Sequence, residues 1–296
     1  MACQLKQMKQ EPEMAKTRRR RRTNSEVEEI KAAAYSVLAE DRPMTLRQVH
    51  YRLVSLGDET AYRNTRSDYN TLSGWLRDMR LDGSVPWEWV EDRLRRPRPV
   101  PMWDSPDEVL WVALRAYRRK VWTDQPEYVE VQLEKDALSA IFEDMLRPYG
   151  VTLNVGRGYT SWSAIKEAAD RYGDGEGVTV LYYGDFDPSG QDMVRSLEEN
   201  LGELGSFPEI VKCALTSEDI ERYALPPDFT KAKDTRRDAF IERHGDVAVE
   251  LDALPGSVIR ERLRDEVEAR MDLDALSRTR QLERDEKATM RRRLGL

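Results

Sequence analysis

The chain has 296 residues, which is enough for about two domains. Its 48 lysine and arginine residues face 55 aspartate and glutamate residues, and the resulting net charge of −7 argues at first sight against a nucleic-acid partner. With two cysteines and two histidines, the sequence excludes a disulfide framework and a histidine-rich metal site, so any metal ion would need carboxylate ligands. No apolar run is long enough for a membrane helix or a signal peptide, and we therefore expect a cytoplasmic protein.

The N-terminal segment 1–24 is predicted to be a flexible basic arm. Eight lysine and arginine residues oppose two glutamates there, so the segment carries +6 and leaves −13 for the rest of the chain. A block of like charge typically stays extended and contacts phosphate groups without reading sequence. A solubilising tail or an address signal is the alternative interpretation.

The next part of the chain has the pattern of three helices and a short aromatic segment. Apolar residues at helical spacing predict helices that begin at Ser25, at Leu46 and at Thr65. Ser25 and Glu28 have the spacing of a capping box, and so do Thr45 and Gln48. The aromatic segment 85–90 is compatible with a strand or wing. We therefore predict a winged-helix domain, a variant of the helix-turn-helix, in 25–100.

Alternating prolines in 95–101 predict an extended linker, followed by a connecting segment, 101–126, that contains a helix at 106–120. Strands and helices then alternate through 127–256, which predicts a mostly parallel sheet with helices on its faces. The expected strands are 128–133, 152–155, 178–183 and 209–215. The charged segment 257–296 is expected to be helical. In such α/β domains the chemistry gathers at the carboxyl ends of the strands.

Acidic residues follow two of these expected strands. Asp185 and Asp187 stand two residues apart after one strand, so their side chains point the same way. Carboxylates this close repel one another unless a divalent cation joins them, and oxygen ligands suit Mg²⁺. Glu134 ends another strand and could complete a metal site. The alternative is that the aspartates form an ordinary turn and Glu134 lies at a helix start.

These motifs resemble the Toprim domain as arranged in the A subunit of topoisomerase VI and in the meiotic double-strand-break transesterase. The resemblance rests on the Glu134-Lys135 pair, on the segment 156–159 and on the DxDPxG motif that begins at Asp185. It extends over 26–254 and is strongest at the Toprim strands. It implies an α/β protein with an N-terminal winged helix followed by a Toprim domain of Rossmann-like sheet.

The resemblance also implies the metal ligands, since the corresponding acids of the family hold Mg²⁺. They are Glu134, Asp185 and Asp187 in this chain. The segment 249–255 is similar to a later acidic stretch of the family, which makes Glu250 an acid beside the site. A strand with alternating exposure explains Glu250 equally well.

The segment 45–53 resembles the family's catalytic-tyrosine motif and identifies Tyr51 as the nucleophile. On a helical wheel Arg47, Tyr51 and Ser55 share the side opposite the apolar residues, so we expect Tyr51 to be exposed. Arg47, one turn earlier, could then stabilise tyrosinate or phosphate charge.

Other residues of these helices have competing interpretations. His50 is expected to be structural, and it stands where the family has an aromatic residue, while Gln48 replaces the acid of the motif. Tyr62 and Tyr69 are rival nucleophiles, although Tyr69 is expected to belong to an apolar stripe. The tryptophans could stack on bases, but packing is the favoured interpretation. They are Trp87, Trp89 and Trp103.

The resemblance implies a compact stand-alone relative of the type IIB topoisomerase A subunit that cleaves double-stranded DNA through a 5′-phosphotyrosyl link. It implies a homodimer and, in a prokaryote, association with the nucleoid. Any ATP use would need a separate ATPase subunit, because the chain has no P-loop. Two alternatives stay open: a Toprim nuclease that hydrolyses DNA with water, and a non-catalytic DNA-binding module.

Overall fold

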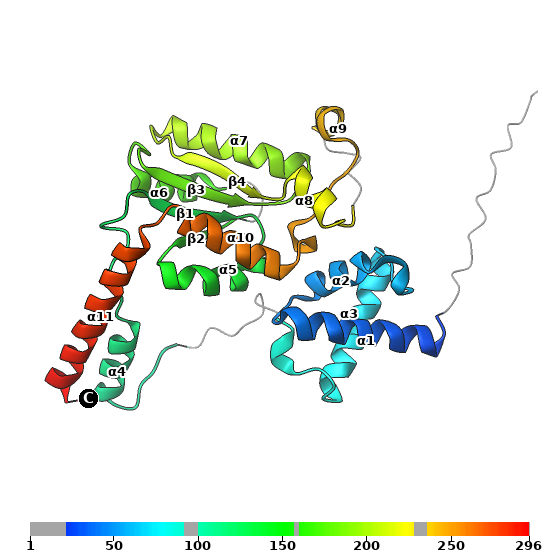
Figure 1. The fold of residues 1–296 in the computed structure, drawn as a ribbon, viewed down its shortest axis with the longest axis horizontal. Helices are drawn as coiled ribbons and strands as arrows, with labels where there is room; N and C mark the ends of the chain where they lie inside the picture. Colours follow the sequence, from blue (N-terminus) through cyan, green and yellow to red (C-terminus); the bar gives the residue numbers. More distant parts are fainter. Residues whose placement is uncertain (1–21, 92–99, 157–159, 228–235, 296) are drawn as a thin grey trace, which may run out of the picture.

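The computed structural model describes residues 22–91, 100–156, 160–227 and 236–295. Within these ranges four strands form one parallel sheet in the order β2-β1-β3-β4 (Figure 1). The strands are β1 (Tyr128–Leu133), β2 (Thr152–Val155), β3 (Val178–Tyr183) and β4 (Glu209–Ala214). Their parallel pairing confirms the alternation of strands and helices that the sequence predicts.

Helices cover both faces of the sheet, and for this reason β3 is buried throughout. One face carries α6 (Trp162–Tyr172) and α7 (Pro188–Glu203), and the other carries α5 (Ser139–Leu146) and α10 (Gly256–Glu268). Successive β3 side chains alternate between the two layers: Val180 packs with α6 and α7, whereas Leu181 packs with α5 and α10.

Three N-terminal helices form a separate apolar core. They are α1 (Asn24–Asp41), α2 (Leu46–Ser55) and α3 (Arg66–Leu81). Ile30, Val49 and Leu72 are buried at its centre. The predicted capping box at the start of α2 is present, because the Thr45 and Gln48 side chains each accept the other's backbone N–H.

The capping box predicted at Ser25 is wrong, because α1 begins earlier. Thr23 is the N-cap. Its side-chain oxygen accepts the Glu26 N–H at 3.2 Å, and the Glu26 carboxylate accepts the Thr23 N–H at 2.7 Å. Ser25 lies inside the helix and donates to Glu29. Two Ser/Thr-x-x-Glu pairs overlap in this sequence, and only the first coincides with extended backbone at the cap.

The strand or wing predicted at 85–90 is also wrong. Trp87–Trp89 forms a 3₁₀ turn, η2, closed by the Trp89 N–H bond to the Pro86 carbonyl. Only Val90 pairs as a strand would, in an isolated parallel bridge to Met44. Trp89 packs on the helical core, whereas Trp87 is 57% exposed.

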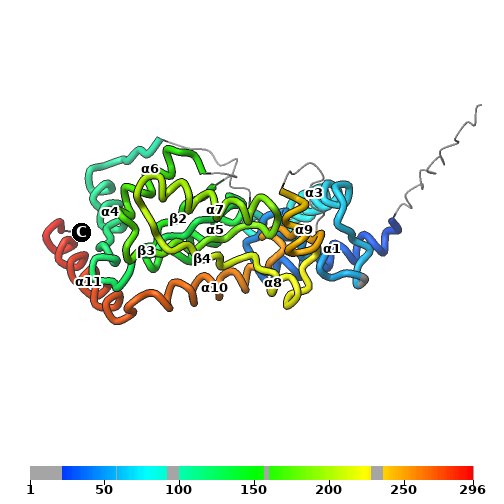
Figure 2. The backbone as a smooth tube through the Cα atoms, turned by 90° about the horizontal axis from the view of Figure 1, so that it is seen from above, coloured from blue at the N-terminus to red at the C-terminus, as the bar shows by residue number. Residues whose placement is uncertain are grey.

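Two helices stand at the end of the molecule opposite the N-terminal helices (Figures 1 and 2). They are α4 (Pro106–Ala116), which ends before the predicted Lys120, and α11 (Leu273–Leu294). Arg119 and Tyr117, just beyond α4, both bond the Glu286 carboxylate of α11. The predicted charged C-terminal helices are thus α10 and α11.

Short elements complete the described chain. They are η1 (Gly57–Glu59), η4 (Asp136–Leu138), η5 (Arg147–Tyr149), α8 (Ser217–Arg222), α9 (Arg237–His244) and η6 (Leu251–Ala253). The strand interpretation of 249–255 therefore fails except at Val249, which bridges Phe186.

Several predicted segments lie partly or wholly outside the described residues. These are the basic arm through 21, the linker at 92–99, and 157–159 of the resemblance. In the described part of the chain, no helix is long and apolar enough to cross a membrane.

Candidate functional site

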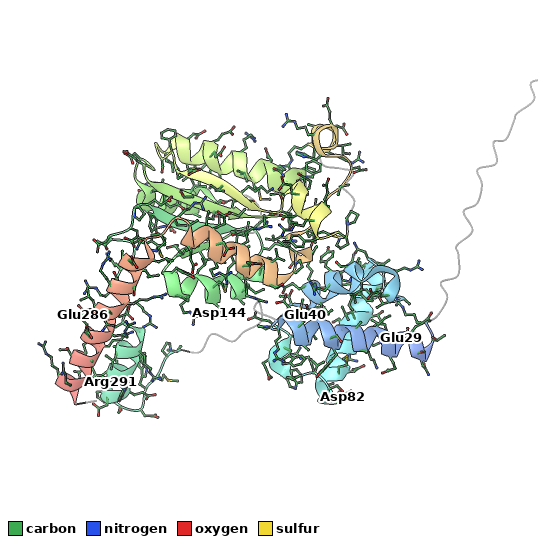
Figure 3. All side chains as sticks on the ribbon, viewed as in Figure 1. Glu29, Glu40, Asp82, Asp144, Glu286 and Arg291 are labelled. Atoms are coloured by element: carbon green, nitrogen blue, oxygen red, sulfur yellow. The ribbon has the colours of Figure 1, made fainter. Side chains whose placement is uncertain are left out.

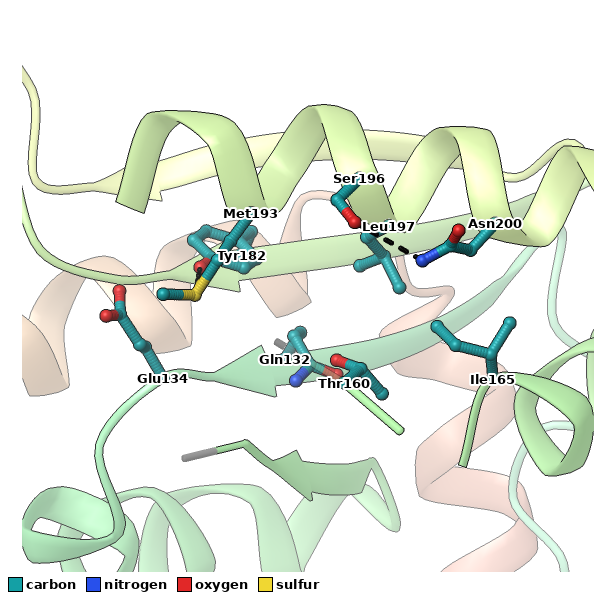
Figure 4. A pocket seen from close by; sticks show the side chains of 9 residues that line it. All are labelled: Gln132, Glu134, Thr160, Ile165, Tyr182, Met193, Ser196, Leu197 and Asn200. Atoms are coloured by element: carbon teal, nitrogen blue, oxygen red, sulfur yellow. Dashed lines mark hydrogen bonds between the residues drawn. The ribbon is translucent and has the colours of Figure 1, made fainter. Parts of the chain in front are cut away.

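The carboxyl ends of β1 and β3 lie side by side and bring two of the predicted acids together. The Asp185 N–H donates to the Glu134 carboxylate at 2.9 Å. Figure 4 shows Glu134 just past the end of β1, with its carboxylate directed toward the α7 layer. A Cβ on Gly184 would lie 2.5 Å from a Glu134 oxygen, so glycine is what allows this close approach.

Asp187 has a structural role that the sequence also allowed. It is the N-cap of α7 and accepts the Gly190 N–H at 2.6 Å. The turn interpretation therefore holds for one of its oxygens. Asp187 also lies close enough to Glu134 to act on it, since the Asp187 charge is among the causes that raise the pKa of Glu134.

Burial and like charge control the titration of these acids. Burial, together with Asp185 and Asp187, raises the pKa of Glu134 to about 7. Burial also raises the pKa of Asp185, although Lys135 opposes the shift. A cluster of this kind holds a proton near neutral pH unless a cation compensates its charge.

One such cation is the ammonium group of Lys135, the residue after Glu134. Its Nζ lies 3.0 Å from Asp185 Oδ1, 2.9 Å from Glu250 and 3.0 Å from Asp252. Burial alone would lower the pKa of Lys135, but these carboxylates outweigh it and raise the pKa. Glu250, which the sequence predicted only as an acid beside the site, is therefore a direct partner of Lys135. Asp252 is a further partner of Lys135 that sequence reasoning missed.

A second lysine enters the cluster from β4. Lys212 Nζ donates to the Asp185 carbonyl at 3.3 Å. Burial lowers the pKa of Lys212 to about 8, against the opposing effect of Glu134, Asp187 and Asp185. Sequence reasoning missed Lys212, and the signal that could have found it is a lysine between the apolar residues Val211 and Cys213 of an expected strand.

Arg47 carries the network across to the N-terminal helices. Its guanidinium pairs with Glu250 and lies 3.5 Å from Asp252 Oδ2. Burial alone would lower the pKa of Arg47, but Glu250 and Asp252 raise it. At the same boundary Asp41 of α1 pairs with Arg260 and accepts the Ser257 N–H at 3.2 Å.

Tyr51 is buried, so the exposure predicted from the helical wheel is wrong. It is 5% exposed and belongs to the apolar core of the sheet, with Leu251 and Ala253 of η6 in the same cluster. The wheel separated the two faces of α2 correctly, since Val49 and Leu53 fill the helical core. The opposite face is covered by η6, which no pattern within α2 could reveal.

The surroundings of Tyr51 act in opposite directions on its hydroxyl. Burial and Glu250 raise the pKa of Tyr51, whereas the hydrogen-bonded Arg47 opposes the shift. The Arg47 guanidinium carbon is 5.8 Å from the centre of the tyrosine ring. The tyrosine predicted as a nucleophile and the acids predicted as metal ligands thus meet through Arg47, Glu250 and Lys135.

The other candidate residues of the N-terminal helices, His50, Tyr62 and Tyr69, lie in different environments. His50 is structural, as expected: its ring nitrogens lie 2.6 Å from the Tyr62 hydroxyl and 3.2 Å from the Asn64 side-chain oxygen, and burial lowers the pKa of His50. Tyr62 is buried beside it. Tyr69 does not join the helical core, so its assignment to the apolar stripe is wrong.

Tyr69 instead lines a cleft of about 580 Å³ between the N-terminal helices and η4. The cleft has an arginine-rich wall and an exposed tryptophan. Its charged and aromatic lining residues are Arg47, Tyr69, Arg77, Arg80, Trp87, Glu91 and Asp136. Arg80 stacks on Trp87, with its guanidinium carbon 4.3 Å from the ring centre. Such a surface combines cations with an aromatic face, the two elements of a single-strand nucleic-acid contact.

The donor chemistry at the strand ends fits a hard cation, but its arrangement is not that of a metal site. The predicted ligands are all carboxylates, which suit Mg²⁺, and the Lys135 ammonium already serves as a bound cation among acids. Among the described residues, however, no group of three or more histidine, cysteine or acidic side chains is arranged to hold a metal ion. Asp185 is held by the Leu251 N–H at 2.7 Å, and Asp187 by its helix cap.

Comparison of the chain with protein-family models and with curated proteins finds no match.

Proposed function

We propose that this chain is a Mg²⁺-dependent enzyme that cleaves double-stranded DNA by tyrosine transesterification, similar to the A subunit of type IIB topoisomerases. In this proposal residues 25–100 are a helical DNA-binding domain related to the winged helix, with the η2 turn where a wing was expected, and 127–256 are the Toprim domain. Tyr51 is the nucleophile, and Arg47 stabilises the charge that develops beside it.

The observation that carries the proposal is the continuous contact from Tyr51 to the strand-end acids. Arg47 contacts Tyr51 and Glu250, Glu250 contacts Lys135, and Lys135 contacts Asp185. Two features that a nucleophilic mechanism needs, a tyrosine with a cationic neighbour and a carboxylate cluster, therefore lie in one site although about eighty residues or more separate them in the sequence.

The reaction would proceed by attack of the Tyr51 oxygen on a backbone phosphorus. A tyrosine–phosphate bond forms, the bond to the 3′ oxygen breaks, and that oxygen leaves with a proton as a 3′ hydroxyl. Glu134, Asp185 and Asp187 are the residues that would hold Mg²⁺, once the Lys135 ammonium withdraws from Asp185, and the ion would supply charge neutralisation at the phosphate. Arg47 would hold the phosphate by paired N–H donors.

In this structure the Tyr51 hydroxyl is not accessible to a DNA backbone. Because Tyr51 is covered by η6, a phosphodiester reaches it only when α2 separates from that turn, in this chain or by exchange within a homodimer. The neighbouring cleft supplies a place for DNA, since Arg77 is 67% exposed along it. Strand passage would further require a separate ATPase subunit.

Covalent trapping tests the proposal. Wild-type protein and the Tyr51→Phe variant are incubated with Mg²⁺ and end-labelled duplex, denatured, and analysed for protein-linked label and for the modified peptide. We expect an adduct at Tyr51 in the wild type and none in Y51F. Tyr35→Phe on α1 is the matched control and should retain the adduct. An adduct at Tyr69, or cleavage by Y51F at the wild-type rate, would overturn the assignment.

A hydrolytic nuclease is the second candidate, and two observations favour it. Tyr51 is buried, and burial with neighbouring acids raises the pKa of Glu134 to about 7, which suits a general base acting on water. Cleavage by Y51F without any adduct, lost in Glu134→Gln, would establish this alternative.

The non-catalytic DNA-binding module is supported by a different observation. The Lys135 ammonium pairs with three acids at once, so it already provides positive charge where a metal ion would bind. DNA binding without cutting by the wild type in Mg²⁺ would favour this module.

A further inference from the structure

A second cavity lies at the opposite end of the sheet domain from the candidate site. It measures about 410 Å³, is open to solvent, and is lined by the segment after α4, by η5 with Gly150, and by α11. Three elements that are distant in the sequence therefore contribute walls to one concave surface. Figure 3 labels Asp144 on α5, the helix that precedes η5, and Glu286 on α11.

The walls are strongly basic. Six cations line the cavity: Arg118, Arg119, Arg147, Arg280, Arg284 and Lys287. The α11 residues at 280, 283, 284 and 287 recur at the spacing of one helix face, which explains how a single helix supplies three of these cations.

Nearby carboxylates compensate only part of this charge. Glu283 is the acidic residue in the lining and binds Lys287 at 2.6 Å and Arg118 at 3.7 Å. Glu286 pairs with Arg119, and Asp144 pairs with Arg147 at 3.4 Å. Six cations against these three carboxylates leave an excess of three positive charges, on a chain whose total is −7.

The chemistry of the cations indicates the ligand. Five of the six are arginines, whose planar guanidinium groups match phosphate oxygens bidentately. The Arg280 guanidinium is fixed by its bond to the Pro148 carbonyl at 2.6 Å, so part of the wall is already ordered. The cavity volume lies within the range of small-molecule sites.

We propose that this cavity, which we term the basic pocket, binds a compact small molecule that carries several adjacent phosphate groups. A cluster of phosphates satisfies the excess charge within the cavity, whereas a duplex backbone presents its phosphates on a convex surface. The proposal does not depend on DNA cleavage at the strand-end acids, because the two sites share no residue.

Calorimetric titration with inorganic tripolyphosphate tests the proposal. The double variant Arg147→Gln with Arg284→Gln removes one cation from each of two walls, and both side chains are solvent-exposed, so the fold should persist by circular dichroism. We expect this variant to bind tripolyphosphate about tenfold or more weakly than the wild type, since each lost guanidinium removes charge-assisted hydrogen bonds to phosphate oxygens.

The control variant is Arg195→Gln with Arg243→Gln, which changes the net charge equally at exposed positions of α7 and α9. It should bind tripolyphosphate like the wild type. Equal weakening in both variants would show general electrostatic attraction and overturn the proposal. So would wild-type binding of tripolyphosphate no tighter than that of monophosphate. The proposal would also be overturned, in favour of a nucleic-acid contact, if the wild type did not bind tripolyphosphate but bound duplex DNA in a way that depends on Arg147 and Arg284.

Discussion

Arg47 of α2 and Glu250, just before η6, form an ion pair across the boundary between the N-terminal helices and the sheet, and the same Glu250 oxygen binds Lys135. The carboxylate thus joins two cations that belong to different parts of the fold. Removing it leaves Arg47 and Lys135 facing each other with less compensating charge, so the boundary should respond to this one residue more than to the neighbouring acids of α10.

Glu250→Gln is expected to loosen the boundary. Loss of a partly buried partner of two cations should lower the free energy of unfolding by about 2 kcal/mol. Hydrogen exchange should rise in α2 around Tyr51, because α2 is held against η6 at this point. Glu261→Gln, at an exposed position of α10, is the control and should change neither quantity. Unchanged exchange in α2 of the Glu250→Gln variant would show that the ion pair does not hold the two parts together.

Lys135→Met removes the cation shared by three acids. The uncompensated carboxylates of Asp185, Glu250 and Asp252 should lower the free energy of unfolding by about 3–5 kcal/mol. Added Mg²⁺ should then raise the melting temperature of this variant more than that of the wild type, at matched ionic strength, since a divalent cation replaces the lost charge. Thermal denaturation monitored by circular dichroism measures both effects. Equal response of the two proteins to Mg²⁺ would speak against a cation site among these acids.

The raised pKa of Glu134 predicts a pH dependence with a definite sign. The folded protein holds this proton up to a pKa of about 7, whereas the unfolded chain releases it near the ordinary value of 4.5. The folded state therefore binds more protons between pH 4.5 and 7, and stability contributed by this group falls as the pH rises through that range. Glu134→Gln should remove this decline and raise the free energy of unfolding at about pH 7.5 by about 1–3 kcal/mol.

Urea denaturation of wild type and Glu134→Gln at about pH 5 and about pH 7.5 measures the difference. Parallel pH profiles of the two proteins below a pH of about 7 would contradict the assignment to Glu134.

The lowered pKa of Lys212, about 8, affects stability in a separate pH range. Between a pH of about 8 and 10.5 the unfolded chain binds more protons than the folded one, so the stability contributed by Lys212 rises with pH.

The cleft beside Tyr69 predicts a salt-dependent contact with DNA. Arg77→Gln should weaken duplex binding about two- to tenfold and reduce the slope of log affinity against log salt by about 1, as expected for one lost phosphate contact. Arg66→Gln is matched in charge and helix but lies at the start of α3, outside the cleft lining. Fluorescence anisotropy over a range of salt concentrations distinguishes them, and identical slopes for both variants would exclude the cleft as the DNA contact.

The sheet could be predicted from the sequence because its signals are local. Each strand is a short run rich in apolar residues, three of the four are followed at once by Glu134, Gly156 or Gly184, and the helix between two strands has its own period. Adjacency of β1 and β3 then brings Glu134 to Asp185. The η2 turn that replaces the expected wing could not be predicted in the same way, because aromatic residues favour strands, whereas the Trp89 N–H bond to the Pro86 carbonyl closes a 3₁₀ turn.

The environment of Tyr51 could not be predicted, because it depends on contact between distant segments. The wheel of α2 gives two faces, but only the folded chain shows that η6 covers the second one. For the same reason Asp252 was missed: nothing in its neighbours indicates that Lys135 and Arg47 converge on it. Tyr69 was misassigned because its spacing matches the stripe of Leu72 and Leu76, although its side chain lies beyond the edge of that core.

The pairing of Asp41 with Arg260, together with Arg47 and Glu250, gives the boundary two charged contacts on neighbouring helices. Charged contacts weaken as mobile ions accumulate, so the fraction of molecules with α2 displaced should increase with ionic strength. If closure is favoured by about 3 kcal/mol, fewer than about one molecule in a hundred is displaced at equilibrium. A polyanion that takes Arg47 from Glu250 would enlarge that fraction by mass action, and the ligand itself would then uncover the tyrosine.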